Sequence, residues 1–337
     1  MSKPNPADAK RHILVVRYSA LGDVSMLWTV LAAALNQNPD IRLTLLTRKT
    51  IAERLPALDR MEIVGLDLDS QYRSWAQLAM FTWGWVRSHH PEAIVDAHQH
   101  LRTQSLRWIA KILGRPLATI QKDRKGRRAL MEDASHVVRP MQYVYTDALR
   151  SVGVAMTWPP AKRARQRRKE GVPPHGLLII APTASRTNKS WELTQAVALG
   201  DTWRQAGGTV AYLGGPADSQ ALLAAGVSAE DLATELSPKQ EHALWSEAQC
   251  AATVDSANQH LAANHGVPAV TLWMGTSPNG GFESFNPAPT MSLTIPESLD
   301  CQPCSIKGSN HCAKDGQFPC RQIEARLVYR ALRTLVD

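Results

Sequence analysis

Short apolar runs alternate with longer amphipathic segments along most of the chain, and this alternation restricts the possible fold more than any other feature. In the first part of the chain, apolar runs predict strands over 12–17, 42–46, 61–66, 93–96 and 117–120. The segments between and after them predict helices over 23–36, 72–89, 102–113 and 141–151. Strands and helices that alternate in this way form α/β proteins with parallel sheets.

The alternation stops at WPPAKRARQRRKEGVPPHG, a segment rich in proline, lysine and arginine that is typical of a linker. It then restarts, with strands expected over 177–181, 209–213, 250–254 and 268–273. Helices are expected over 191–206, 217–225, 239–247 and 257–265. We therefore predict an N-terminal domain over 1–157, a linker over 158–176, and a C-terminal domain over 177–337 with a cysteine-rich loop at 300–320 and a terminal helix.

Length and charge limit the classes of function. The 337 residues are enough for two domain cores. The net charge of +8 favours an anionic partner, which is a nucleic acid, a phosphorylated substrate or an acidic membrane surface. No apolar run approaches the roughly 18 residues of a membrane span, and the first residues are polar, so we expect a cytoplasmic protein. The absence of G-x-G-x-x-G and of G-x-x-x-x-G-K-[ST] argues against nicotinamide dehydrogenases and P-loop enzymes.

A carboxylate stands in RYSALGDVSM, where the first predicted strand gives way to a helix. Asp23 follows Gly22 in the first turn of that helix. One interpretation is that Asp23 only complements the helix dipole, which contributes about 0.3–1 kcal/mol. The other is that it is the general base of an active site, because ligands of open α/β sheets bind at the carboxyl ends of strands.

The segment VDSANQHLAANHG predicts a strand, a turn and a helix capped by Ser256. The backbone N–H groups of Ser256, Ala257 and Asn258 would point outward from the helix start and bind a phosphate or diphosphate. His260, one turn later, either contacts the same anion or is an interior histidine on the helix face of Leu261.

Two further turns follow predicted strands of the C-terminal half. APTASRTNKSWEL places Lys189 in a polar turn that would bind a diphosphate, although a solvated loop has the same composition. YLGGPADSQ places glycines at a strand end, where a base or ribose can approach the backbone, and Asp218 would accept from hydroxyls.

The segments ILVVRYSALGDVSM, APTASRTNKSW, LGGPADSQ and VDSANQHLAA, in this order, resemble glycosyltransferase family nine, the ADP-heptose:lipopolysaccharide heptosyltransferases. The resemblance covers residues 12–275 and implies a GT-B fold, in which two Rossmann-like domains face each other across a cleft. It implies that the N-terminal domain binds the acceptor and the C-terminal domain binds the donor. The expected reaction is an inverting, metal-independent transfer of heptose from ADP-heptose to a lipopolysaccharide inner-core or related glycolipid.

The resemblance also implies roles for individual residues. Asp23 matches the catalytic base, and Gly22 lies beside it on the acceptor side. The residues implied on the donor side are Ser185 at a phosphate, Lys189, Ser256 and Ala257 at the leaving diphosphate, Asp218 at the ribose, Asp255 at the sugar hydroxyls and His260 near the diphosphate. Ala257 stands where the family commonly has glycine, so a divergent member that uses another nucleotide sugar or acceptor is the alternative.

Four of the five cysteines gather near the C-terminus, at Cys301, Cys304, Cys312 and Cys320. A reducing cytoplasm argues against stable disulfides. These thiolates would form a structural zinc site, although only one C-x2-C pair is present. Free thiols or an inducible disulfide are the alternative, and catalysis is expected to need no cofactor.

Two basic clusters, residues 121–128 and 162–169, are either solvated faces or points of contact with acidic lipid. A glycolipid acceptor favours peripheral contact with the inner leaflet of the inner membrane. The competing class, a nucleic-acid-binding protein, is disfavoured because the chain lacks a helix-turn-helix signature, zinc-finger spacing and an aromatic RNA-binding motif.

Overall fold

The computed structural model describes residues 11–160, 176–285, 287–295, 299–312, 314 and 316–336. The chain divides into two compact units. Unit 1 comprises Met1–Lys122 and Met141–Pro160, and unit 2 comprises Asp123–Pro140 and Ala161–Asp337. Each unit contains one parallel sheet, which confirms the predicted α/β class. Most of the predicted linker and the whole basic cluster at 162–169 lie outside the described residues.

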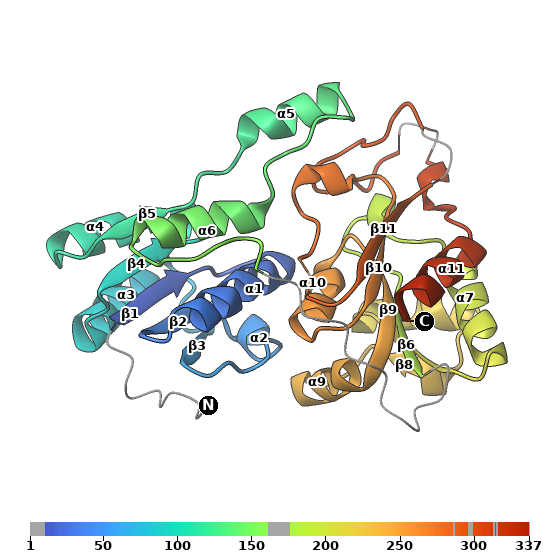
Figure 1. Ribbon diagram of the computed structural model, residues 1–337, viewed down its shortest axis with the longest axis horizontal. Helices are drawn as coiled ribbons and strands as arrows, with labels where there is room; N and C mark the ends of the chain where they lie inside the picture. Colours follow the sequence, from blue (N-terminus) through green and yellow to red (C-terminus); the bar gives the residue numbers. More distant parts are fainter. Residues whose placement is uncertain are drawn as a thin grey trace. The chain divides into compact units, whose positions relative to one another are not determined.

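The sheet of unit 1 has five parallel strands in the order β3-β2-β1-β4-β5 (Figure 1). Its strands are β1 (Arg11–Val16), β2 (Ile41–Arg48), β3 (Met61–Leu66), β4 (Ala93–Asp96) and β5 (Leu117–Thr119). The central strand β1 is fully buried from Ile13 to Val16. A central strand covered by helices on both faces needs an almost continuous apolar run, which explains why β1 is readable in the sequence.

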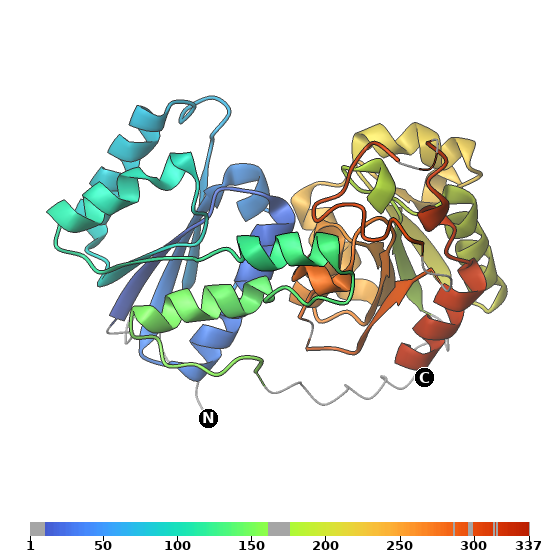
Figure 2. The same cartoon turned by 90° about the horizontal axis from the view of Figure 1, so that it is seen from above.

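Helices cover both faces of this sheet (Figures 1 and 2). They are α1 (Leu21–Gln37), α2 (Lys49–Ala52), α3 (Trp75–His89), α4 (Ser105–Ile112) and α6 (Met141–Ser151). Helices α1 and α6 pack together on one face, and α3 and α4 pack together on the other. Ser74 is the N-cap of α3, and its side chain accepts from the Gln77 backbone N–H in a capping box.

The sheet of unit 2 has six parallel strands in the order β11-β10-β9-β6-β7-β8. Its strands are β6 (Leu177–Ala181), β7 (Thr209–Leu213), β8 (Leu232–Ala233), β9 (Ala248–Val254), β10 (Ala269–Trp273) and β11 (Thr290–Thr294). Its helices are α5 (Arg124–Glu132), α7 (Leu193–Gln205), α8 (Ser219–Ala224), α9 (Pro238–Glu247), α10 (Ala257–Asn264) and α11 (Ala325–Val336). Helix α11 packs beside α7 and against β9 and β10, where it closes the core around Trp191 and Trp203.

Helix α5 lies in the first half of the sequence but belongs to unit 2. The Arg127 guanidinium stacks 5.0 Å from the centre of the Phe282 ring. The Val138 N–H donates to the Asn279 carbonyl at 2.8 Å. Unit 1 therefore differs from the predicted domain over 1–157, because the segment Asp123–Pro140 finds its packing partners in unit 2.

None of the helices in the described ranges combines the length and apolar character that a membrane crossing requires.

Candidate active site

Asp23 lies in the first turn of α1, as predicted, and pairs with a buried arginine. The Oδ2 atom of Asp23 is 2.6 Å from Nη2 of Arg17, the residue that follows β1. Arg17 is only 4% exposed, whereas the Asp23 side chain is 29% exposed. Arg17 also donates to the Ala97 carbonyl and stacks over the Tyr145 ring. The fixed guanidinium therefore holds the carboxylate in place while one side of it stays open.

A histidine pair follows β4 near this carboxylate. Asp96 accepts from the backbone N–H of His98 at 3.0 Å and thereby shapes the turn. The His98 ring stacks on His100, and its Nε2 atom is 3.4 Å from the Ser19 hydroxyl. Burial, and then the charge of Arg17, lowers the pKa of His98 to about 3. His98 is therefore neutral at neutral pH, and sequence analysis assigned no role to it or to Arg17.

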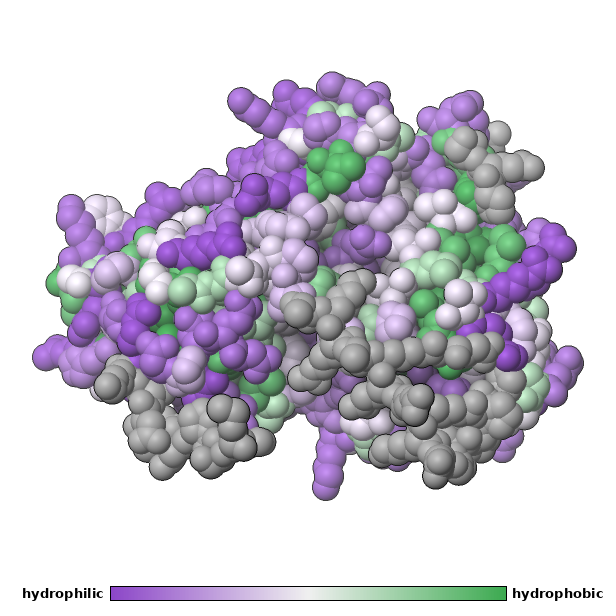
Figure 3. Space-filling model, viewed as in Figure 1, coloured by the Kyte–Doolittle hydropathy of each residue, from purple (hydrophilic) through white to green (hydrophobic). Residues whose placement is uncertain are grey.

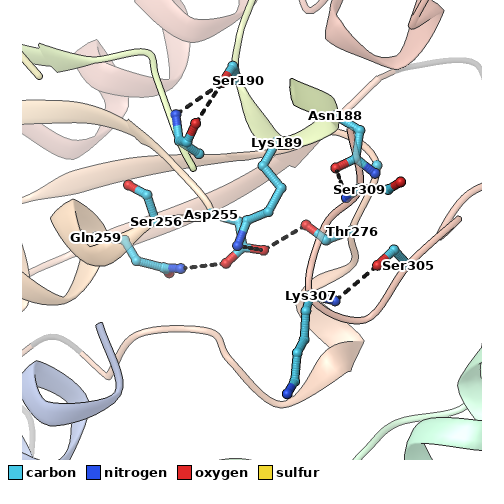
Figure 4. A network of polar contacts seen from close by, with 12 residues as sticks. Asn188, Lys189, Ser190, Asp255, Ser256, Gln259, Thr276, Ser305, Lys307 and Ser309 are labelled. Atoms are coloured by element: carbon cyan, nitrogen blue, oxygen red, sulfur yellow. Dashed lines mark hydrogen bonds and ion pairs between the residues drawn. The ribbon is translucent and has the colours of Figure 1, made fainter. Parts of the chain in front are cut away.

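In unit 2 the structure brings two predicted residues together. Lys189 ends a 3₁₀ turn, Thr187–Lys189, after β6, and Asp255 follows β9. Nζ of Lys189 is 3.0 Å from Oδ2 of Asp255 (Figure 4). Because β6 and β9 are adjacent parallel strands, the turns at their carboxyl ends lie at one edge of the sheet.

Two further buried side chains hold Asp255. The Thr276 hydroxyl donates to Oδ2 at 2.8 Å, and the Gln259 amide donates to Oδ1 at 3.2 Å (Figure 4). Asp255 itself is only 5% exposed. A carboxylate offers about four acceptor positions, and Lys189, Thr276 and Gln259 occupy three of them. This carboxylate is therefore suited to fixing the Lys189 ammonium.

The start of α10 differs in part from the prediction. Ser256 is the N-cap, and its hydroxyl accepts from the Asn258 N–H at 3.3 Å. Its own N–H donates to the Val254 carbonyl at 2.7 Å. Two of the three N–H groups predicted to point outward are thus used within the chain, because the tight turn after β9 and the cap consume them. Ala257 begins the helix, and His260 is buried in it; the contact of His260 with a diphosphate stays a prediction.

The remaining predicted residues occupy separate places. Ser185 is exposed in the turn after β6. Asp218 closes its own turn, because its Oδ2 accepts from the Gly215 N–H at 2.7 Å. Gly22 lies half-buried in the first turn of α1, beside Asp23. Their ligand contacts stay predictions.

Asn188 fastens the cysteine-bearing loop beside Lys189. Its amide nitrogen donates to Sγ of Cys304 at 3.1 Å, and its amide oxygen accepts from the Ser309 N–H at 2.6 Å. Its backbone carbonyl accepts from the Gly275 N–H at 2.7 Å, at the end of β10. Asn188 is almost fully buried. The side chain and the backbone of this one residue thus tie the Lys189 turn, the end of β10 and the loop together.

The cysteines are all free thiols. Burial, and then the nearby Cys304, Cys312 and Cys301, raises the pKa of the Cys320 thiol to about 12. Across the described ranges, no three or more His, Cys, Asp or Glu side chains are arranged to hold a metal ion. The zinc site at the four clustered cysteines stays a prediction.

Comparisons with known proteins agree with this architecture. The family model of Glycosyltransferase family 9 (heptosyltransferase) matches residues 115–309. No curated protein matches the chain. A family 9 glycosyl transferase from Veillonella parvula DSM 2008 is 18% identical, with a TM-score of 0.71 and 97% of each chain covered.

Two solved heptosyltransferases from E. coli are also similar. WaaC with ADP is 13% identical, with a TM-score of 0.65 and coverage of 95% of this chain and 98% of WaaC. ADP-heptose lps heptosyltransferase II is 16% identical, with a TM-score of 0.60 and coverage of 96% and 98%. Likeness at these identities shows the fold, which is a GT-B fold built from two Rossmann-like domains.

Proposed function

Because the chain belongs to glycosyltransferase family 9, the heptosyltransferase family, we propose that it transfers heptose from ADP-heptose to a lipopolysaccharide inner-core or related glycolipid acceptor. One observation carries the proposal: the family match spans the Lys189–Asp255 pair at the carboxyl ends of adjacent strands. Two similar structures support the choice of donor, since one was solved with ADP and the other is named for ADP-heptose.

Asp23 is the proposed general base. Its carboxylate accepts the proton of the acceptor hydroxyl while that oxygen attacks the anomeric carbon of the donor sugar. The new bond forms as the bond from the anomeric carbon to the diphosphate oxygen breaks, and the electron pair leaves with ADP. A single displacement of this kind inverts the anomeric centre. The pairing with Arg17 supports this role because it fixes the carboxylate, and the partial exposure of Asp23 leaves it accessible.

Lys189 and the start of α10 are the proposed leaving-group site. Negative charge develops on the diphosphate as the sugar departs, so a fixed ammonium and the positive end of the α10 helix dipole would stabilise that charge, although two N–H groups of the helix start are used within the chain. Lys189 is held within ion-pair distance of Asp255. This arrangement supports the proposal that the transfer uses side chains and backbone in place of a catalytic metal ion.

The acceptor and the membrane define the proposed setting of the reaction. A phosphorylated glycolipid is anionic and matches the net charge of +8. The first basic cluster, 121–128, includes the start of α5, whose exposed cations lie on the surface of unit 2. We accordingly place the enzyme in the cytoplasm with peripheral contact to the inner leaflet.

The test separates donor binding from chemistry. Isothermal titration calorimetry with ADP, UDP and GDP in the presence of a chelator should show binding of ADP. Lys189→Ala should weaken ADP binding about tenfold or more, because a charge-assisted contact of about 1.5–3 kcal/mol is lost. Arg330→Ala, which removes an exposed cation from α11, is the matched control and should bind ADP as the wild type does.

Asp23→Asn is the second arm of this test. It should bind ADP normally but should abolish release of ADP from ADP-heptose in the presence of acceptor. Absence of ADP binding by the wild type would reject the donor assignment. Full activity of Asp23→Asn would reject Asp23 as the base.

A further inference from the structure

Helix α4 of unit 1 and the 3₁₀ turn before it, Leu101–Thr103, expose apolar side chains that nothing in the described ranges covers. Leu101, Trp108 and Ile112 are 68%, 66% and 66% exposed, and we refer to them as the α4 patch. Trp108 and Ile112 are four residues apart in α4 and so lie on the same helix face, and Leu101 lies in the 3₁₀ turn just before the helix. The opposite face of α4 is already used, because Leu106 and Ile109 are buried in the core of unit 1. The patch is therefore additional to the face that folding requires.

Apolar exposure is concentrated around this helix. Helix α3, which packs beside α4 (Figure 2), exposes Trp75 by 54% and Met80 by 67%. Of the eight large apolar side chains exposed among the described residues, five therefore lie between residues 75 and 112. In Figure 3, hydrophobic atoms interrupt the hydrophilic surface at the end of unit 1 where α4 lies. Single exposed apolar residues are ordinary, but a cluster on neighbouring helices marks an interaction surface.

The charged residues along the segment that carries the patch all have one sign. The segment from Ala97 to Lys122 contains no aspartate or glutamate, and its five cations are Arg102, Arg107, Lys111, Arg115 and Lys122. Arg107 and Lys111 are exposed and directly precede Trp108 and Ile112, so the cations border the apolar side chains along the helix. A short helix with Trp and Leu or Ile on one side and Lys or Arg beside them is typical of helices that lie in the surface of anionic membranes.

We propose that the α4 patch docks on an anionic lipid bilayer, with Trp108 and Ile112 among the headgroups and Arg107 and Lys111 against the lipid phosphates. A second copy of the chain fits this face poorly, because a two-fold contact would bring two sets of cations together. This docking role rests on the proposed function, because the α4 patch would be the surface by which the enzyme meets the leaflet that carries its acceptor. Binding of the chain to the bilayer does not depend on heptose transfer and can be measured without donor or acceptor.

Vesicle sedimentation tests the proposal with the full chain. The wild type should bind vesicles that are half phosphatidylglycerol and half phosphatidylcholine, should bind phosphatidylcholine vesicles weakly, and should be released by salt. The double variant Trp108→Gln with Ile112→Gln should bind the anionic vesicles at least tenfold more weakly. The control is Leu223→Gln on α8 of unit 2, which removes an exposed aliphatic side chain (45% exposed) away from the patch and should leave vesicle binding unchanged.

The charge contribution has its own variants. Arg107→Gln with Lys111→Gln should weaken binding to anionic vesicles about 25-fold, since each cation near such a surface contributes about 1 kcal/mol. Arg326→Gln with Arg330→Gln on α11 removes the same charge from an exposed face of unit 2 and should change binding far less.

Three results would overturn the inference. The first is a wild type that does not bind anionic vesicles, and the second is a pair of α4 variants that bind as the wild type does. The third is a dimer, seen by sedimentation velocity without lipid, that the Trp108→Gln, Ile112→Gln variant no longer forms although it still binds vesicles. That result would assign the patch to contact with a second copy of the chain. ADP titration of the same variants without lipid should be normal, so failure of docking and failure of the donor assignment are read separately.

Discussion

Substituting Gly308 by alanine is expected to displace Lys189 and thereby weaken donor binding. Gly308 lies in the loop that Asn188 fastens beside the Lys189 turn, and its φ is +87°. A Cβ atom added there would lie 2.4 Å from Cδ of Lys189 and 2.8 Å from Cβ of Arg186. Both separations are shorter than van der Waals contact, so either the loop or the Lys189 side chain must move.

The size of the effect follows from these contacts. Alanine at a left-handed backbone position costs about 1–2 kcal/mol of folding free energy. Overpacking adds about 1–3 kcal/mol if the neighbours stay in place. The flexible end of Lys189 can relieve part of that strain by moving away from Asp255. The folding free energy then falls less, but Lys189 no longer lies where it would contact the donor. A charge-assisted hydrogen bond contributes about 1.5–3 kcal/mol, so ADP affinity should fall about 10- to 100-fold.

A second glycine in the same cysteine-rich loop provides the matched control. Gly316 has a φ of +75°, and apart from the glycine and its two chain neighbours no described residue has an atom within 4 Å of a Cβ added there. Gly316→Ala therefore carries the backbone cost without the contact with Lys189. Calorimetric titration with ADP and chemical denaturation should be measured for both variants. The reasoning is refuted if Gly308→Ala binds ADP as tightly as the wild type, or if Gly316→Ala loses the same affinity.

Three further predictions concern pH, the buried amide and metal. The pKa of His98 is lowered to about 3 by burial and Arg17, and that of His265 to about 4 by burial and His242. In the unfolded chain each of these histidines binds a proton near pH 6.5, whereas in the folded chain it stays neutral to a much lower pH. The free energy of unfolding should therefore not depend on these histidines above about pH 7. From about pH 6 toward pH 4 it should fall by about 1.4 kcal/mol per pH unit for each histidine. Denaturation at several pH values checks this, and a steep dependence unchanged in His265→Gln would contradict it. Asn188→Ala should lower the free energy of unfolding by about 1–3 kcal/mol, since it removes the two hydrogen bonds by which this buried amide holds the loop, and its ADP affinity should also fall. If the four clustered cysteines hold zinc, elemental analysis of the purified protein should find about one metal per chain, removal with a chelator should lower the melting temperature, and ADP binding should persist.

Several strands could be predicted from the sequence because burial on both faces forces an apolar run. Strands β1, β6 and β10 are central or nearly so, and their side chains are almost entirely buried on both faces. Strand β11 (Thr290–Thr294) has only half-buried and exposed side chains at the edge of its sheet, so it leaves no such run. Helix α5 was missed for a related reason: among its nine residues only Gly126 and Leu130 are buried, and the rest resemble a solvated basic loop.

In the candidate site, sequence analysis could identify positions but not partnerships. Lys189 and Asp255 stand at strand ends in recognisable segments, and their ion pair follows only from the adjacency of β6 and β9. Thr276 donates to Asp255 from the end of another strand, and this contact depends on the order of strands in the sheet. The pairing of Arg17 with Asp23 could have been predicted from the sequence. A cation at the end of a buried strand needs a counter-charge, and Asp23 follows it by six residues.

Exposure separates the two carboxylates that pair with cations. Asp23 and Asp255 each follow a buried strand, and each lies within hydrogen-bond distance of a basic side chain. Asp255 is buried and accepts from Thr276 and Gln259 as well, so a substrate proton would have to displace existing donors. Asp23 is open on one side, while its partner Arg17 is buried behind it. A general base must come within hydrogen-bond distance of the proton it removes, so accessibility favours Asp23 for that role and leaves Asp255 to orient Lys189.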